Sequence, residues 1–175
     1  MRREGGSVKP ILSVISLGDD VSTDDIIAGK YLRADSTEFW RQHLFEDFDE
    51  TLRERIGAST MIMAGNNFGC GSSREQAVLG LKATGLRVIV AKSFGAIFYR
   101  NCVNNGLLAA TYDEADALGI CDREEVMIDY SARTIRSLRT YASIAWKAPP
   151  LQLEIFAAGG LIEFYRSRRS RPKEA

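Results

Sequence analysis

The sequence predicts an α/β fold in which parallel βαβ units carry an added antiparallel edge. Residues 60–112 alternate short apolar runs with amphipathic stretches, which is the pattern of parallel strands linked by crossover helices. Residues 125–143 alternate polar and apolar side chains, as one or two strands of a hairpin-like edge would. A length of 175 residues with 45% hydrophobic residues suits one domain that buries its own core.

The N-terminal elements follow from local composition. We expect a flexible N-terminus at 1–9, a strand at 11–17, and a loop with one helical turn at 22–32. Residues 36–57 are charged on one side and aromatic on the other, which predicts a helix that ends at Gly57.

The middle of the chain has the densest pattern. It predicts buried strands at 60–65, 86–91 and 107–112, with helices at 72–85 and 93–106 between them. Each of these helices has a serine at its expected start and a glycine at its expected end, which are the residue types that begin and stop helices.

The C-terminal part is predicted from shorter signals. We expect a short helix at 113–119 and a last short helix at 149–160. The basic residues 167–175 are typical of a disordered tail, so the folded domain is predicted to span 10–166.

The loop "GNNFGCGSSREQA", residues 65–77, joins a parallel strand to the start of a helix. Ligands of open α/β sheets sit at such junctions, where helix N–H groups are unpaired and carry partial positive charge. Gly69 and Gly71 allow a sharp turn and a close approach of the backbone. Arg74 adds a planar donor for a carboxylate or phosphate, so the loop predicts an anion site at Gly71–Arg74.

The same loop also has a purely structural interpretation. Ser72 and Glu75 match the S-x-x-E capping box, and Ser73 with Gln76 match it one residue later. The two common nucleotide-binding motifs are absent. The loop lacks the Gly-Lys-Ser/Thr of a P-loop, and Arg74 stands where a dinucleotide-binding fingerprint has its third glycine. From these residues alone, a helix cap and a reactive site both remain open.

Composition excludes several classes of function. Lysine plus arginine number 23, equal to aspartate plus glutamate, which argues against a nucleic-acid binder with a broad basic face. Three scattered cysteines fit a reducing cytoplasm, and with His43 as the sole histidine they predict no metal site in this chain. No apolar stretch is long enough to predict a membrane span.

Four stretches resemble one family in the order in which they occur. They are "TDDI" at 23–26, "NNFGCGSSREQA" at 66–77, "AKSFGAIFYRNCVNNGL" at 91–107 and "AGGLIEFY" at 158–165. In this order they resemble the small subunit of 3-isopropylmalate dehydratase, which matches the swivel domain of aconitase and homoaconitase. The resemblance covers about residues 10–166 and implies a single swivelling β/β/α domain of the aconitase type.

The resemblance implies half of a hydro-lyase. A hydroxy diacid loses water to give an alkene diacid, and water returns at the neighbouring carbon. In the family, a large subunit holds a [4Fe–4S] cluster, so we expect no cofactor in this chain and a heterodimer or heterotetramer in the cytoplasm. The chemistry also needs a base and cations for the carboxylate charge, which this chain can offer.

Site roles are implied by the same resemblance. Ser72 matches the family's catalytic base, and Asp24 matches an aspartate of its active site. Arg74 and Ser73, with the backbone at Gly71, match its carboxylate-binding groups. Each has a structural alternative in helix capping, which is ordinary chemistry for Ser, Thr and Asp.

In the family that the chain resembles, the segment after "TDDI" carries substrate specificity, and here that segment is residues 28–36. Leu32 suits a branched apolar side chain such as that of isopropylmalate, whereas Arg33 suits the distal carboxylate of homoaconitate. A subunit of a methylmalate (citraconate) hydro-lyase, a carboxylate-binding domain without catalysis, and RNA binding through the basic tail are the further alternatives. Gln76 stands where the family often has histidine, and Gln keeps the capping chemistry.

Overall fold

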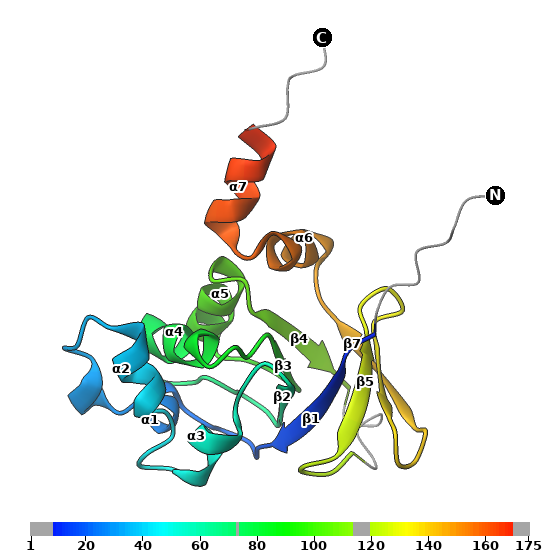
Figure 1. Cartoon of the computed structure of the whole chain (residues 1–175), viewed down its shortest axis with the longest axis horizontal. Coiled ribbons are helices and arrows are strands. Elements are labelled where there is room, and N and C mark those ends of the chain that lie inside the picture. The colour runs from blue at the N-terminus through cyan, green and yellow to red at the C-terminus, as the bar shows by residue number, and fades with distance from the viewer. Residues whose placement is uncertain (1–8, 73, 114–119, 170–175) are drawn as a thin grey trace.

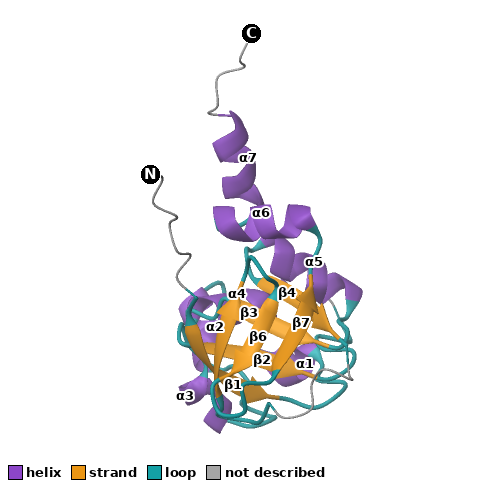
Figure 2. Ribbon diagram, turned by 90° about the vertical axis from the view of Figure 1, so that its right-hand side faces the viewer, coloured by secondary structure: helices purple, strands orange, loops and turns teal. Residues whose placement is uncertain are grey.

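Seven strands form a closed barrel in this computed structural model, which describes residues 9–72, 74–113 and 120–169 (Figure 2). Around the barrel the order is β1-β2-β3-β4-β7-β6-β5. The strands are β1 Ile11–Ser16, β2 Thr60–Ala64, β3 Val88–Ala91, β4 Leu108–Tyr112, β5 Glu125–Asp129, β6 Thr134–Ser137 and β7 Ser143–Lys147. β1 to β4 pair in parallel, which confirms the predicted βαβ units.

The antiparallel part differs from the expected hairpin-like edge. Residues 125–143 and their continuation contain three strands, β5, β6 and β7, rather than one or two. β5 pairs with β1 and β7 pairs with β4, so both outer strands of the parallel half gain partners. The predicted antiparallel part is confirmed, but its strands close the barrel, which pairs backbone groups that an open edge would leave unpaired.

Two apolar layers lie on the two faces of the parallel strands. The paired residues Val14, Met61, Val88 and Leu108 point into the barrel, where they pack with the antiparallel strands. Their neighbours Ile15, Ile62, Ile89 and Ala109 point outward and pack under the helices. Because side chains alternate along a strand, burial on both faces explains why these strands read as continuous apolar runs.

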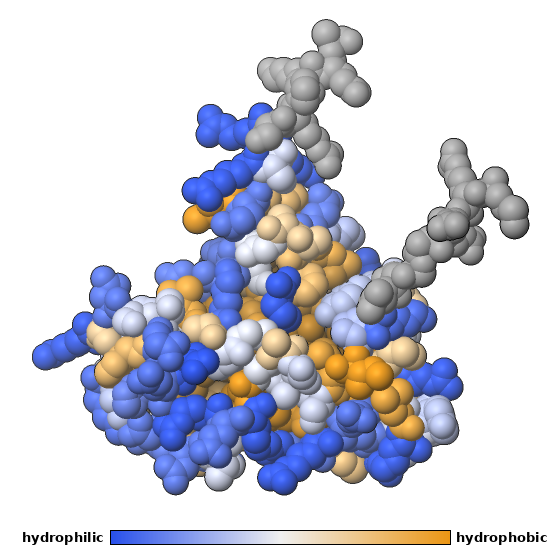
Figure 3. Space-filling model, viewed as in Figure 1, coloured by the Kyte–Doolittle hydropathy of each residue, from blue (hydrophilic) through white to orange (hydrophobic). Residues whose placement is uncertain are grey.

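The helices cover the parallel half of the barrel (Figure 1). They are α1 Thr23–Ile26, η1 Gly29–Tyr31, α2 Thr37–Gln42, α3 Thr51–Arg55, α4 Glu75–Ala83, α5 Ala96–Asn104, α6 Pro150–Ala158 and α7 Leu161–Arg169. α4 and α5 lie against β2 to β4, away from β5 and β7, and α2 packs on α4. The surface around α1 to α3 is largely hydrophilic (Figure 3).

The expected single helix at 36–57 is two short helices, α2 and α3. Phe45 lies between them with a φ of 56°, which no α-helix accommodates. Its N–H donates to the carbonyl of Ile26 at 2.9 Å, and its side chain is fully buried. Asp49 then accepts a hydrogen bond from the Thr51 N–H, which starts α3. A tertiary contact therefore overrides the helical periodicity.

The C-terminal region contains more helix than predicted. α6 confirms the expected helix at 149–160, and its Gln152 donates to the Ala109 carbonyl at 2.7 Å. α7 follows and projects away from the barrel (Figures 1 and 2). Residues 167–169 are therefore helical rather than a disordered tail, because the buried Phe164 anchors α7. Residues 170–175 and 1–8 lie outside the described residues, as do residues 114–119 of the helix expected at 113–119.

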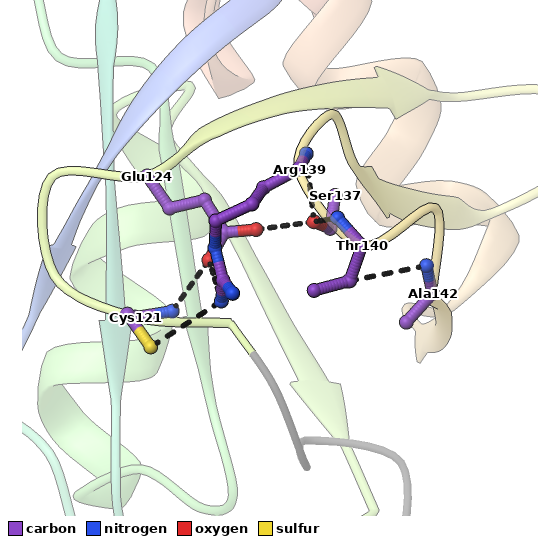
Figure 4. Close-up of polar contacts among 6 residues, drawn as sticks. All are labelled: Cys121, Glu124, Ser137, Arg139, Thr140 and Ala142. Carbon is purple, nitrogen blue, oxygen red and sulfur yellow. Dashed lines mark hydrogen bonds and ion pairs between the residues drawn. The ribbon is translucent and has the colours of Figure 1, made fainter.

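A buried carboxylate fastens the antiparallel strands where the chain enters β5 (Figure 4). The Glu124 side chain is 5% exposed. It accepts hydrogen bonds from the hydroxyl of Ser137, from the N–H of Cys121 at 3.0 Å and from the guanidinium of Arg139 at 3.0 Å. Burial raises the pKa of Glu124, but these three donors outweigh burial and hold the pKa below its ordinary value.

None of the helices in the described part of the chain has both the length and the apolar character needed to cross a membrane.

Candidate functional site

The glycine loop after β2 is pressed against the start of α5. Gly69 has a φ of 75°, and a Cβ there would lie 2.2 Å from the ring of Phe98. Gly95 is equally confined, because a Cβ would lie 2.4 Å from the Gly69 carbonyl oxygen. Only glycine fits at both positions, so the loop follows one path across the carboxyl end of the parallel strands.

The segment leading into α1 runs alongside this loop. Gly69 donates its N–H to the carbonyl of Val21 at 2.7 Å, and Thr23 donates its N–H to the carbonyl of Cys70 at 2.9 Å. Ser22 and Cys70 form a parallel bridge between the two segments. The hydroxyl of Thr23 then donates to the carbonyl of Ser72 at 2.7 Å. Ser72 itself is exposed.

Arg74 lies between the loop and α1. Its Nη1 is 2.5 Å from Oδ1 of Asp24 and donates to the carbonyl of Ile27 at 3.1 Å. The arginine side chain is 13% exposed and the aspartate 54%, so the pair sits at the surface with the guanidinium mostly covered. The Arg74 Nε is buried without a partner among the described residues. The site therefore contains a nearly buried cation with unused donor capacity.

The capping box that Ser72 and Glu75 would form is not present. α4 begins at Glu75, and its N-cap is Arg74, which makes no side-chain capping bond. Glu75 instead accepts a hydrogen bond from the side chain of Asn105. Ser93 is not a cap either, because α5 starts after Gly95 and the Ser93 hydroxyl accepts from the Asn67 N–H. The Ser72 hydroxyl is thus not engaged as the helix cap.

A reciprocal capping box does occur, one segment earlier. The Ser22 hydroxyl accepts from the Asp25 N–H, and the Asp25 carboxylate accepts from the Ser22 N–H. This box fixes the start of α1, and with it Thr23 and Asp24.

Leu32 and Arg33 lie farther along the same segment. Leu32 is half-buried and packs against the core under the helices, and Arg33 is exposed. No hydrogen bond or ion pair between described residues joins either of them to Ser72 or Arg74. The structure therefore brings Asp24, Gly71, Ser72 and Arg74 together and leaves Leu32 and Arg33 at the margin. Ser73 lies outside the described residues.

A polar cluster holds that margin in place. The Tyr31 hydroxyl donates to one oxygen of Glu46 at 2.6 Å, and His43 Nδ1 lies 2.6 Å from the other oxygen. The rings of Tyr31 and His43 stack with centroids 4.0 Å apart. Hydrogen bonds from Tyr31 and then His43 lower the pKa of Glu46 to about 2. His43 thus has a structural role in holding Glu46 and Tyr31.

Two features of the site were missed by sequence reasoning. The first is the Thr23 hydroxyl, whose residue type suggested only a helix cap. The second is the Ile27 carbonyl that binds Arg74, beside Gly29, where a Cβ would lie 3.4 Å from the guanidinium. A backbone carbonyl leaves no signal in the sequence, whereas the glycine at 29 was a visible sign of close approach.

The cysteines do not gather at this site. Cys70 is in the glycine loop, Cys102 is buried in α5, and Cys121 is exposed before β5. Burial raises the pKa of the Cys102 thiol. In the described ranges, no three His, Cys, Asp or Glu side chains are grouped so that they could hold a metal ion.

Comparisons with known proteins place this geometry in a family. The model of the aconitase C-terminal domain matches residues 23–115. A homoaconitase small subunit of Methanocaldococcus jannaschii is 41% identical over 159 residues, which cover 87% of this chain and 88% of that relative. The 3-isopropylmalate dehydratase small subunit 1 of Archaeoglobus fulgidus is 39% identical and covers 88% of this chain and 95% of its own. The chain belongs to the family of 3-isopropylmalate dehydratase small subunits and their homoaconitase relatives.

A solved structure of this family has the same fold. The crystal structure of a 3-isopropylmalate dehydratase from M. jannaschii superposes with a TM-score of 0.85 at 37% identity, over 93% of this chain and 96% of that one. This confirms the aconitase swivel-type fold. The matched family region begins at Thr23 and includes α1, the glycine loop and Arg74.

Proposed function

We propose that this chain is the small subunit of a 3-isopropylmalate dehydratase, a lyase that interconverts 2- and 3-isopropylmalate in leucine biosynthesis. The observation that carries the proposal is that an exposed Ser72 and a nearly buried Arg74 lie two residues apart on one short loop. Family membership supports the reaction class, and the substrate is supported by the names of several similar proteins, which are 3-isopropylmalate dehydratase small subunits. The three free cysteines support a cytoplasmic setting.

Ser72 is proposed as the base that takes the proton from the carbon beside a carboxylate. Serine does not ionise near neutrality in water, so its oxyanion needs donors and positive charge nearby. Arg74 supplies the charge, and the first N–H groups of the nine-residue helix α4 follow directly in the chain. Because the Ser72 hydroxyl does not cap α4, it is available for proton transfer.

Arg74 is proposed to bind a substrate carboxylate, together with the backbone at Gly71 and with Ser73. The guanidinium is held by Asp24 and by the Ile27 carbonyl, so it need not be ordered when substrate arrives. The guanidinium has five N–H donors, and those that Asp24 and Ile27 leave unused give it capacity for a further acceptor. Asp24 therefore acts by orienting the Arg74 guanidinium.

The remaining chemistry is assigned to a partner. Dehydration also needs a Lewis acid on the leaving hydroxyl, which a [4Fe–4S] cluster supplies in this family. Residues of this chain do not fit such a cluster, since its three cysteines lie on separate elements. We therefore propose an iron–sulfur large subunit, in a heterodimer or heterotetramer, that completes the site over Ser72.

Homoaconitate is the second candidate substrate. The M. jannaschii relative is named a homoaconitase small subunit, and Arg33 offers an exposed cation for a third carboxylate. Leu32 favours isopropylmalate less strongly than expected from sequence, because it is already packed against the core.

The test is reconstitution with the iron–sulfur large subunit and assay against isopropylmalate, homoaconitate and citraconate side by side. We expect the highest kcat/KM with isopropylmalate. Ser72→Ala should lower kcat by about 100- to 10,000-fold, the range for loss of a general base. Ser131→Ala, an exposed serine in the turn between β5 and β6, is the matched control. Normal turnover by Ser72→Ala would refute the base assignment, and no hydratase activity on any diacid would favour a non-catalytic carboxylate-binding domain.

A further inference from the structure

We infer that Thr23 is a positioning residue for Ser72, acting through the hydrogen bond from its hydroxyl to the Ser72 carbonyl. The inference rests on the proposed role of Ser72. The Thr23 hydroxyl bonds to the carbonyl of Ser72 and not to its side chain, so Thr23 is not itself a catalytic residue.

The first step is the burial of Thr23. The residue is 1% exposed, so its hydroxyl cannot be satisfied by bulk water. The hydroxyl donates to the Ser72 carbonyl at 2.7 Å, which is a short and well-formed bond. The cost of leaving a buried hydroxyl unpaired therefore favours the position of Ser72 that the structure shows.

The second step is where this bond lies. Three successive hydrogen bonds join the loop to the α1 segment. Gly69 donates to Val21, and Thr23 donates from its N–H to Cys70 and from its hydroxyl to Ser72. Gly71, with a φ of 86°, turns the chain between the last two contacts. Among hydrogen bonds joining described residues, that from the Thr23 hydroxyl alone reaches Ser72. Ser72 is exposed, so no packing replaces the bond if it is lost.

The third step is that Arg74 is held separately. Its contacts are with Ile27 and Asp24, and neither uses the Thr23 hydroxyl. Loss of that hydroxyl should therefore loosen the base and leave the carboxylate-binding cation in place. Such a change affects the chemical step more than substrate binding, which predicts a fall in kcat with little change in KM.

The experiment uses Thr23→Val, which keeps the shape and removes the hydroxyl, and Thr23→Ser, which keeps the hydroxyl. In the reconstituted pair we expect Thr23→Val to lower kcat by about 10- to 100-fold, the scale for a misplaced catalytic group. KM should change by less than about threefold, and Thr23→Ser should restore most of kcat. Thr84→Val is the matched control, because the Thr84 hydroxyl also donates to a carbonyl, that of Leu81, at 2.7 Å at the far end of α4.

A second measurement needs no partner. The backbone order parameter of Ser72, from ¹⁵N relaxation on the isolated chain, should fall in Thr23→Val and not in Thr23→Ser or Thr84→Val. An unchanged order parameter would overturn the inference, as would equal losses of kcat in Thr23→Val and Thr23→Ser. An inactive wild-type pair would instead count against the proposed function, and the relaxation data would still decide whether Thr23 orders Ser72.

Discussion

The hydroxyl of Ser137 should contribute a large share of this domain's stability. It donates to the buried Glu124 carboxylate and accepts from the N–H groups of Thr140 at 2.8 Å and Arg139 at 3.2 Å. A hydrogen bond to a charged group contributes about 1.5–3 kcal/mol to the free energy of unfolding. A neutral hydrogen bond contributes about 1 kcal/mol or less when water can replace the lost partner. Thr140 and Arg139 are exposed, so water can replace the Ser137 hydroxyl as the acceptor for their N–H groups.

Ser137→Ala should therefore lower the free energy of unfolding by about 2–4 kcal/mol at pH 7. Urea titration is the assay, and with a slope of about 2 kcal/mol per molar the midpoint should fall by about 1–2 M. Ser131→Ala, at an exposed turn, should change the free energy of unfolding by less than about 0.5 kcal/mol.

The loss of stability caused by Ser137→Ala should become smaller at low pH. The pKa of folded Glu124 lies below its ordinary value of 4.5, so the network stabilises the fold above that pH. This stability is lost as the pH falls through the folded pKa, because the unfolded chain binds the proton more readily. The difference between Ser137→Ala and the wild type should therefore shrink below about pH 4. A loss under about 1 kcal/mol at pH 7, or one that is constant with pH, would refute the reasoning.

Three further predictions concern the site and its support. Arg74→Lys should raise KM by about 10- to 100-fold in the reconstituted pair, since lysine lacks the planar fork, and an unchanged KM would exclude carboxylate binding there. Gly69→Ala should unfold the chain or lower its melting temperature by about 10 °C or more, whereas Gly18→Ala, with no atom within 4 Å of the added Cβ, should melt as the wild type does. Tyr31→Phe should raise the pKa of Glu46 from about 2 towards 4.5, which ¹³C NMR titration of the side chain can follow; a constant value would show that the hydroxyl is not its main cause.

The parts of the fold that sequence predicted well are those set by local burial. Strands buried on both faces read as apolar runs, and Gly85 and Gly106, with positive φ, ended the helices where expected. The break at Phe45 was not predictable in this way, because it depends on the Ile26 carbonyl far away in the chain. Barrel closure likewise depends on pairing Ile11 with Met127, and nothing local in either strand specifies that partner.

The candidate site was only partly predictable, again because some of its contacts join segments that are distant in the chain. Asp24, Ser72 and Arg74 were found by motif, and the structure brings them together. The S-x-x-E pattern misled because Ser72 forms tertiary contacts in place of the local cap that its sequence allows. The hydrogen bonds from the Thr23 hydroxyl to Ser72 and from Arg74 to the Ile27 carbonyl form only where the α1 segment meets the glycine loop. The periodicity of the sequence does not predict that meeting.

The closed barrel constrains how any partner can be recognised. Each strand in the described part of the barrel has a neighbouring strand on both sides, so the sheet has no edge strand to which a partner would add a strand. Recognition must instead use side chains and loops on a body whose backbone is already complete. Assembly then resembles the docking of two preformed shapes, with association rates of about 10⁵–10⁷ M⁻¹s⁻¹ and with affinity set mainly by how slowly the pair separates.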